Sequence, residues 1–256
     1  MPKFGNITNP SADIVKEIRT VAKMGFDYAE IAIEEPMGTP ELLRKNKSAI
    51  LKSLKKYNMF SLGHAPWWAE LGSLNQLVRR RWINQIKAVI DIASEIGAKK
   101  LTVHLEIRGV AANNKKSRDQ ALHNYIDSIK TLQAHSKGVL LVLENTPNNS
   151  LEEFKYVVKN TEVAVNFDVG HAFIQGGMGE VKRYIKTFGK KIRHLHFHDN
   201  GGMRDEHLGI GFGKIDFKAV AKEIKEIGYD DTITFEIFFP GRAFAKTSKE
   251  ILKKMW

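Results

Sequence analysis

The stretch SADIVKEIRTVAKMGFDYAEIAI, residues 11–33, contains a helix followed by a strand, and it decides the predicted fold. Apolar residues recur at helical spacing through Ser11–Met24, which predicts an amphipathic helix. Gly25 follows, and glycine readily adopts the left-handed backbone conformation that ends helices. Tyr28–Ile33 then has the composition of a short strand. A strand of this kind next to an amphipathic helix is typical of a parallel α/β sheet.

Similar units recur over the whole chain. The joints IGAKK at Gly97 and IGYDD at Gly228 resemble MGFDY at Gly25, as repeated units should. The predicted strands are Phe4–Ile7, Tyr28–Ile33, Met59–His64, Lys100–His104, Val139–Glu144, Val163–Asp168, Arg193–His198 and Thr232–Ile237. Eight strands alternating with eight helices in 256 residues predict one α/β domain over residues 1–256, a closed (β/α)8 TIM barrel. An open doubly wound sheet is the alternative, but no Gly-rich phosphate loop follows the first strand.

Composition narrows the classes of function. The chain has no cysteine, so disulfides and thiolate chemistry are excluded and any metal must have nitrogen and oxygen ligands. No apolar run reaches the roughly 20 residues of a membrane span, and the N-terminal sequence lacks a signal-peptide pattern, so we expect a cytoplasmic protein with no membrane partner. The net charge of +11 indicates a polyanionic partner, a phosphorylated substrate or a Lys-rich chain from a thermophile, and all three stay open.

Six consecutive predicted strands carry a possible metal ligand at or near their ends. These residues are His64, His104, Glu144, Asp168 with His171 just beyond it, the three histidines His194, His196 and His198, and Glu236. Active sites of barrels lie at this face, where the strand ends converge on one axis. Carboxylates and imidazoles crowded there without a cation would repel one another or need protons. We therefore predict a divalent metal, for which Zn, Mn, Co and Mg are all suitable.

The seventh strand and the loop after it add further candidates. In HLHFHDN the three histidines alternate with apolar residues and so share one face, where one would bind metal and the others would orient ligands or substrate. The Gly-rich loop GGMRDEHLGIGFG, residues 201–213, places Asp205 and His207 one residue apart. This pair suits a further metal, although ordinary loop polarity would also explain it.

At these residues the chain resembles the xylose isomerase-like barrels, a superfamily that also contains endonuclease IV, and the resemblance covers the whole chain. It is carried by HAPWW at His64, VHLE at His104, LEN at Glu144, FDVGH at 168–171, HFHDN at His196, DEHLGIG at 205–211 and FE at Glu236. The motifs are specific together, whereas each one alone is weak. Dimers and tetramers are common among such barrels, so the resemblance also implies a possible homo-oligomer.

The sugar isomerase and epimerase branch, to which the chain is most similar, implies one metal and a small sugar or sugar phosphate as substrate. The resemblance implies Glu144, Asp168, His196 and Glu236 as metal ligands, with Glu144 and Glu236 also acting as base and acid. Proton transfer would take place next to a metal-polarised carbonyl. The segments MGFDYAEIAIEEP and GKIDF resemble this branch, in which Glu30 or Glu34 could contact the sugar. Trp67 and Trp68 could stack on it.

The alternative is a metal-dependent AP endonuclease similar to endonuclease IV, which would cleave DNA at abasic sites. That branch uses three zinc ions, and its additional ligand positions correspond here to His64, His104, His171, Asp205 and His207. With His198, these residues are possible contacts of additional metals or of the substrate. Nucleic acid would then be the partner, but the acidic loop EEPMGTPE after the second strand lacks the arginine that this branch carries there. A barrel that binds a metal and a metabolite without turnover is a third possibility.

Overall fold

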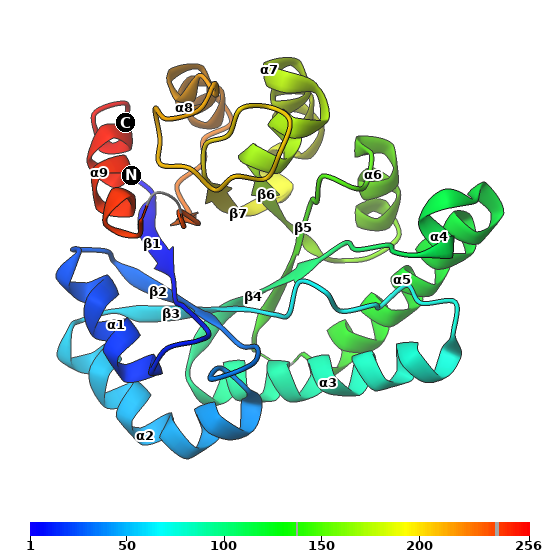
Figure 1. Cartoon of the computed structure of the whole chain (residues 1–256), viewed down its shortest axis with the longest axis horizontal. Coiled ribbons are helices and arrows are strands. Elements are labelled where there is room, and N and C mark those ends of the chain that lie inside the picture. Colours follow the sequence, from blue (N-terminus) through cyan, green and yellow to red (C-terminus); the bar gives the residue numbers. More distant parts are fainter. Residues whose placement is uncertain (137, 239–240) are drawn as a thin grey trace.

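The computed structural model describes residues 1–136, 138–238 and 241–256, in which eight parallel strands close into a barrel in chain order (Figure 1). The strands are β1 (Lys3–Ile7), β2 (Tyr28–Ala32), β3 (Phe60–His64), β4 (Ala98–His104), β5 (Leu140–Glu144), β6 (Ala164–Asp168), β7 (Ile192–Phe197) and β8 (Thr232–Phe235). β8 pairs with β1 and completes the cylinder. The predicted (β/α)8 TIM barrel is therefore confirmed.

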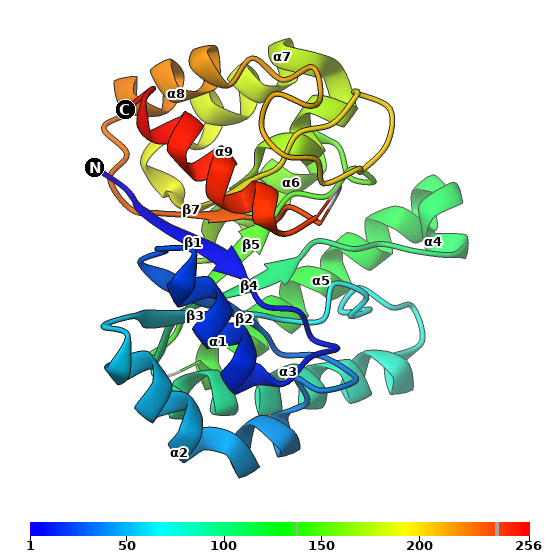
Figure 2. The same cartoon turned by 60° about the vertical axis from the view of Figure 1, so that its left-hand side comes forward.

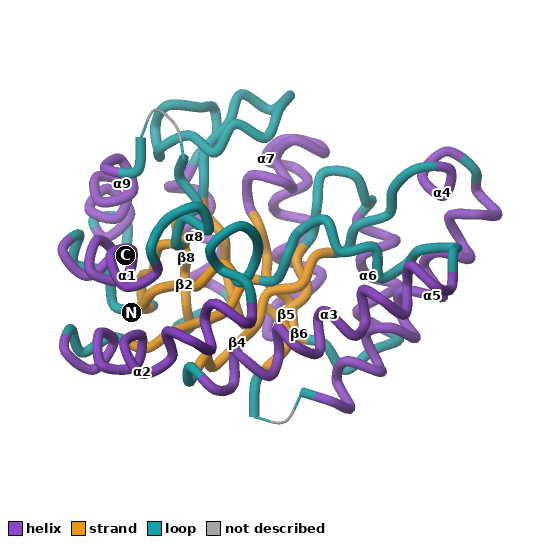
Figure 3. The backbone as a smooth tube through the Cα atoms, turned by 60° about the horizontal axis from the view of Figure 1, so that its bottom comes forward, coloured by secondary structure: helices purple, strands orange, loops and turns teal. Residues whose placement is uncertain are grey.

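The helices surround the strands, as the tube in Figure 3 shows. They are α1 (Ile14–Lys23), α2 (Pro40–Lys56), α3 (Gln76–Glu95), α4 (Val110–Asn113), α5 (Lys115–His135), α6 (Leu151–Lys159), α7 (Val169–Phe188), α8 (Phe217–Glu226) and α9 (Ala243–Lys253), with a 3-10 turn η1 (Gly189–Lys191). The short α4 is a helix that the sequence did not predict, and it lies at the side of the molecule away from both termini (Figure 2). Among the helices that the structure describes, none combines the length and apolarity needed to cross a membrane.

The first helix shows how local sequence sets the element boundaries. We predicted a helix over Ser11–Met24, but α1 begins only at Ile14 because the Asp13 side chain accepts a hydrogen bond from the Lys16 N–H and caps it. Gly25 has the expected positive φ of 75° just after the helix. Elsewhere the observed strand ends differ from the predicted ones by one or two residues: β7 ends before His198, and β8 ends before Glu236.

The two faces of the strands divide the side chains by polarity. Outward-facing residues such as Leu101 and Val103 belong to the large apolar core between the strands and the helices. The alternate residues Thr102 and His104 belong instead to the polar interior of the barrel. Barrel interiors are usually filled by bulky branched residues, so a polar interior in this barrel marks a functional region.

Strand register brings the predicted ligands together. His104 pairs with Glu144 between β4 and β5, and Asp168 pairs with His196 between β6 and β7. Residues that pair across parallel strands point to the same side of the sheet. The closed barrel thus aims these side chains at one point on its axis.

Candidate metal centre

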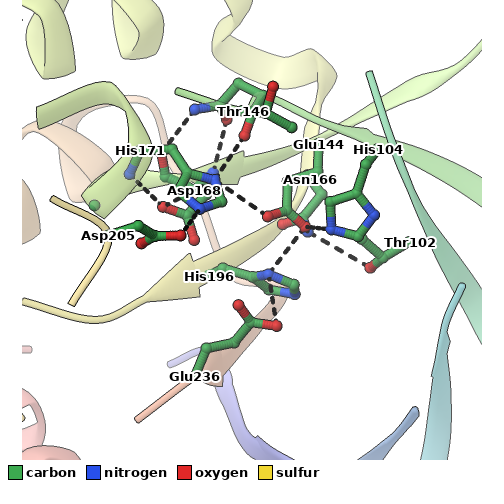
Figure 4. A network of polar contacts seen from close by, with 12 residues as sticks. Thr102, His104, Glu144, Thr146, Asn166, Asp168, His171, His196, Asp205 and Glu236 are labelled. Carbon is green, nitrogen blue, oxygen red and sulfur yellow. Dashed lines mark hydrogen bonds and ion pairs between the residues drawn. The ribbon is translucent and has the colours of Figure 1, made fainter. Parts of the chain in front are cut away.

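Four predicted ligands form a compact cluster at the carboxyl ends of the strands (Figure 4). Each of Glu144, Asp168, His196 and Glu236 offers one ligand atom, and these atoms all lie within 4.8 Å of one another. His196 Nδ1 lies 3.1 Å from Glu144 Oε2 and 3.3 Å from Glu236 Oε1. All four residues are buried. We call these four residues the tetrad.

The tetrad contains polar atoms that lack the partners expected inside a protein. Glu144 Oε1, Asp168 Oδ2 and His196 Nδ1 are buried, and among the described residues none of them has a hydrogen-bond partner. A buried polar group left without a partner costs about 1–3 kcal/mol. Three carboxylates and one imidazole form a donor set that suits Zn, Mn, Co or Mg. The tetrad therefore fits a divalent ion, which would satisfy all three atoms.

A second group lies beside the tetrad and shares Glu144 with it. His64, His104 and Glu144 could together hold an ion, because their ligand atoms also lie within 4.8 Å of one another. His104 Nε2 is 3.4 Å from Glu144 Oε2, and His64 Nε2 is 3.4 Å from Glu236 Oε1. Both histidines are buried.

A third group contains His171, His198, Asp205 and His207. Asp205 Oδ2 lies 3.1 Å from His171 Nε2 and 3.2 Å from His207 Nε2. The structure thus gathers the possible metal ligands predicted from the sequence, except His194, into three adjoining groups. The three histidines of HLHFHDN separate: His196 lies in the tetrad, His198 in this third group, and His194 against Glu30.

The loop that carries Asp205 and His207 is held in place by a buried carboxylate. Asp199 accepts hydrogen bonds from the N–H groups of Gly211, Gly213 and Ile215, at 2.9, 3.0 and 3.1 Å. His207 has a positive φ of 47°, and its Nδ1 lies 2.8 Å from the Glu236 carbonyl oxygen. These contacts fix the loop against the end of β8, which explains how two loop residues reach the strand-end cluster.

The charges of the tetrad shift the pKa values of its members in opposite directions. Burial raises the pKa of Glu144. Burial also opposes ionisation of Glu236, but the charges of His196 and His64 outweigh it and lower the pKa of Glu236. For His196, burial is outweighed by the surrounding carboxylates, Glu144 first among them, so its pKa is well above its usual value.

A cavity of about 770 Å³ opens onto the three groups. Its wall includes Glu34 and Trp67, and Trp67 is 50% exposed. Trp68 is not among the described residues that line the cavity and packs edge-on against Trp67 at 5.7 Å between ring centroids. Of the two carboxylates considered for sugar contact, Glu34 lines the cavity, whereas Glu30 is fully buried inside the barrel.

Two polar residues deeper in the barrel contact the tetrad or its neighbour Glu30, and they were not among the predicted site residues. Asn166 Nδ2 donates a hydrogen bond to Glu144 Oε2 at 2.8 Å, and the Thr102 hydroxyl donates to Glu30 Oε1 at 2.9 Å. Each lies two residues before a strand-end ligand, Asp168 and His104 respectively. The alternation of side chains along a strand was therefore a usable signal for both.

Known proteins resemble this chain over almost its whole length. The model of the family described as xylose isomerase-like TIM barrel matches residues 18–255. An uncharacterized protein of Methanocaldococcus jannaschii is 32% identical over 254 residues, covering 94% of this chain and 84% of its own. A probable endonuclease 4 of Aquifex aeolicus is 24% identical over 266 residues, covering 94% of this chain and 92% of its own.

A solved structure agrees with the family match. The crystal structure of a D-tagatose 3-epimerase-like protein superposes with a TM-score of 0.85 at 28% sequence identity, covering 99% of this chain and 96% of that one. Because the family model matches residues 18–255 and the strands close into the same kind of barrel, the chain belongs to the xylose isomerase-like TIM barrel family.

Proposed function

We propose that this protein is a divalent-metal-dependent sugar isomerase or epimerase that transfers a proton at a carbon next to a carbonyl group. The observation that carries the proposal is the tetrad, which has unpartnered buried ligand atoms and two carboxylates facing a cavity. The similarity to a D-tagatose 3-epimerase-like protein over 99% of the chain supports the same substrate class.

Each member of the tetrad has a role in this proposal. Glu144, Asp168, His196 and Glu236 would hold the ion, which would polarise a carbonyl and a neighbouring hydroxyl of the sugar. Glu144 ends β5 and Glu236 follows β8, so the two carboxylates reach the cavity from strands that are not neighbours. One carboxylate would accept the proton from carbon, and the other carboxyl group would return a proton from a different side. Trp67 and His171, which line the cavity, would position the sugar.

The charges around the cavity favour a neutral sugar over a polyanion. Glu34 and Glu106 line its wall in addition to the predicted ligands. In the part of the chain that the structure describes, Arg242 is the one lysine or arginine that lines the cavity. Its guanidinium already contacts Glu17 and donates to the Asn6 side chain and the Ile7 carbonyl oxygen. A nucleic-acid site needs several cations for phosphates, and this wall offers few.

Abasic-site endonuclease activity is the second candidate, because a specific observation favours it. All nine residues that match the three-zinc ligand set lie in the three adjoining groups, and the Aquifex aeolicus relative is named a probable endonuclease 4. In that reading, His64 and His104 with Glu144 would hold one ion, the tetrad a second, and His171, Asp205 and His207 a third. The net charge of +11 would help to bind the DNA backbone.

One pair of assays on the wild-type protein separates the two candidates. With Zn²⁺ or Mn²⁺ added, we expect deuterium from heavy water to enter a ketose of a sugar panel at the carbon beside the carbonyl, as followed by NMR. EDTA should stop this incorporation. A duplex with one abasic site should stay intact at micromolar protein. Nicking of that duplex without deuterium incorporation into any sugar would overturn the proposal and support the endonuclease.

A further inference from the structure

A buried glutamate lies directly beneath the tetrad and takes no part in the chemistry described so far. Glu30, in the middle of β2, is fully buried and is not one of the described residues that line the cavity. Its Oε2 lies 2.9 Å from His194 Nε2 and 3.2 Å from His196 Nε2, and its Oε1 accepts from the Thr102 hydroxyl at 2.9 Å. Glu30 therefore contacts the one imidazole of the tetrad from the side opposite the cluster.

A lysine lower in the barrel supplies the first donor of a series of hydrogen bonds that ends at Glu30. A lysine ammonium group has three protons and accepts nothing. Lys100 Nζ donates to the Arg193 carbonyl oxygen, to Asp231 Oδ1 and, at 2.8 Å, to the Thr232 hydroxyl. The Thr232 hydroxyl is therefore an acceptor toward Lys100, and its own proton is free to point elsewhere.

The next partner of that hydroxyl is His194, whose Nδ1 lies 2.8 Å from Thr232 Oγ1. The Thr232 carbonyl oxygen lies 3.1 Å from the same Nδ1, and the other ring nitrogen decides the direction of these bonds. Nε2 of His194 lies 2.9 Å from Glu30 Oε2, and an ionised carboxylate only accepts, so Nε2 carries a proton that points at Glu30. In the neutral ring, Nδ1 then accepts the proton of the Thr232 hydroxyl.

Glu30 accepts hydrogen bonds from Thr102, His194 and His196, and these bonds set the orientation of the His196 ring. An ionised carboxylate accepts hydrogen bonds and donates none. His196 Nε2 lies between the two oxygens, at 3.3 Å from Oε1 and 3.2 Å from Oε2, so Nε2 must carry a proton. When the ring is neutral, as a metal ligand must be, its lone pair is then on Nδ1, the atom that faces Glu144 and Glu236 and has no hydrogen-bond partner among the described residues.

We propose that Glu30 is the positioning residue of the metal centre. The hydrogen-bond series from Lys100 through Thr232 and His194 to Glu30 fixes the tautomer of His196, so that Nδ1 is ready to bind the ion. Carboxylates behind metal-binding histidines commonly orient the ring and strengthen it as a ligand. The inference rests on the metal centre of the proposed function and not on its sugar chemistry.

Glu30→Gln tests the role with little change of shape. Both carboxylate oxygens lie near His196 Nε2, whereas the uncharged glutamine amide offers a single oxygen for the N–H groups of His194 and His196. The Nε2 proton of His196 is then held more weakly, so Nδ1 becomes a weaker metal ligand. We expect the dissociation constant for Zn²⁺, measured against a competing chelator, to rise about 10–100-fold.

Two further variants separate positioning from a general loss of packing. Glu30→Asp keeps an ionised acceptor, so it should recover part of the zinc affinity. Tyr28→Phe removes another buried hydrogen bond from the same strand, that between the Tyr28 and Thr234 hydroxyls, and should leave the zinc affinity unchanged. Wild-type zinc affinity in Glu30→Gln, or an equal loss in Tyr28→Phe, would overturn the proposal.

The protonation of His194 and His196 can also be measured on the wild-type protein, without any variant. Nitrogen-15 NMR of the zinc-loaded protein should show His194 and His196 both protonated at Nε2. A proton on Nδ1 of either ring would overturn the proposed series. If wild-type protein binds no zinc at all, the metal centre of the proposed function fails as well. If zinc binds normally but sugar exchange is absent, only the proposed reaction fails and the role of Glu30 stands.

Discussion

Glu144→Gln and Glu236→Gln should each lower deuterium incorporation into the sugar about 10²–10⁴-fold, the usual contribution of a general acid or base. Glutamine keeps the size of the side chain and one ligand oxygen, but it cannot accept a proton from carbon or return one. Because both residues are also proposed ligands, the rates should be compared at a metal concentration that saturates each variant, with metal content checked on the same samples.

The control for this pair is Glu226→Gln, which changes a glutamate on α8 whose side chain is 59% exposed. It should exchange deuterium at the wild-type rate. Metal-saturated Glu144→Gln or Glu236→Gln with wild-type exchange would remove that residue from the acid and base roles. If only one of the two variants loses exchange, a single carboxylate serves both faces of the sugar.

The second large effect concerns metal binding and thermal stability. A ligand present at a hundred times its dissociation constant stabilises the folded state by about 2.7 kcal/mol. For a chain of this size that should raise the Tm of the wild-type protein by roughly 5–10 °C. Asp168→Asn should abolish this shift at the same metal concentration, because it removes one of the three anionic ligands of the tetrad. Thermal unfolding with and without Zn²⁺ measures the difference within each variant.

Asp168 also caps a helix, so the control for Asp168→Asn is the same substitution at another helix-capping aspartate. Its Oδ1 accepts from the His171 N–H at 2.6 Å at the start of α7, and asparagine can keep that bond. Asp13 caps α1 in the same manner, so Asp13→Asn changes the same chemistry away from the metal centre. Asp13→Asn should retain the full metal-dependent rise in Tm. A full rise in Asp168→Asn would contradict its role as a ligand.

The fold and the ligand candidates were accessible from the sequence because both depend on local periodicity. The alternation of strands and helices predicted the barrel, and closure of a barrel necessarily brings the strand ends together. Glu144 and Asp168 end their strands as predicted. His198 and Glu236 lie one residue beyond theirs and still belong to the ligand groups.

Other contacts of the site could not be predicted from the sequence because they join segments that are far apart along the chain. Nothing local indicates that Glu30 lies against His194 and His196, which are more than 160 positions away along the chain. The attachment of the Asp205 loop through Asp199 is also a tertiary effect, since it needs backbone N–H groups up to 16 residues further on. Thr102 and Asn166, in contrast, could have been predicted from the sequence, because side chains two residues apart on a strand share a face.

Anomalous diffraction from a crystal of the protein soaked in Zn²⁺ or Mn²⁺, recorded at the absorption edge of that metal, would locate the bound ion. We expect an anomalous peak enclosed by Glu144, Asp168, His196 and Glu236. A metal-saturated crystal with no peak at these four side chains, or with its peak on the outer surface of the barrel, would contradict the proposed metal centre.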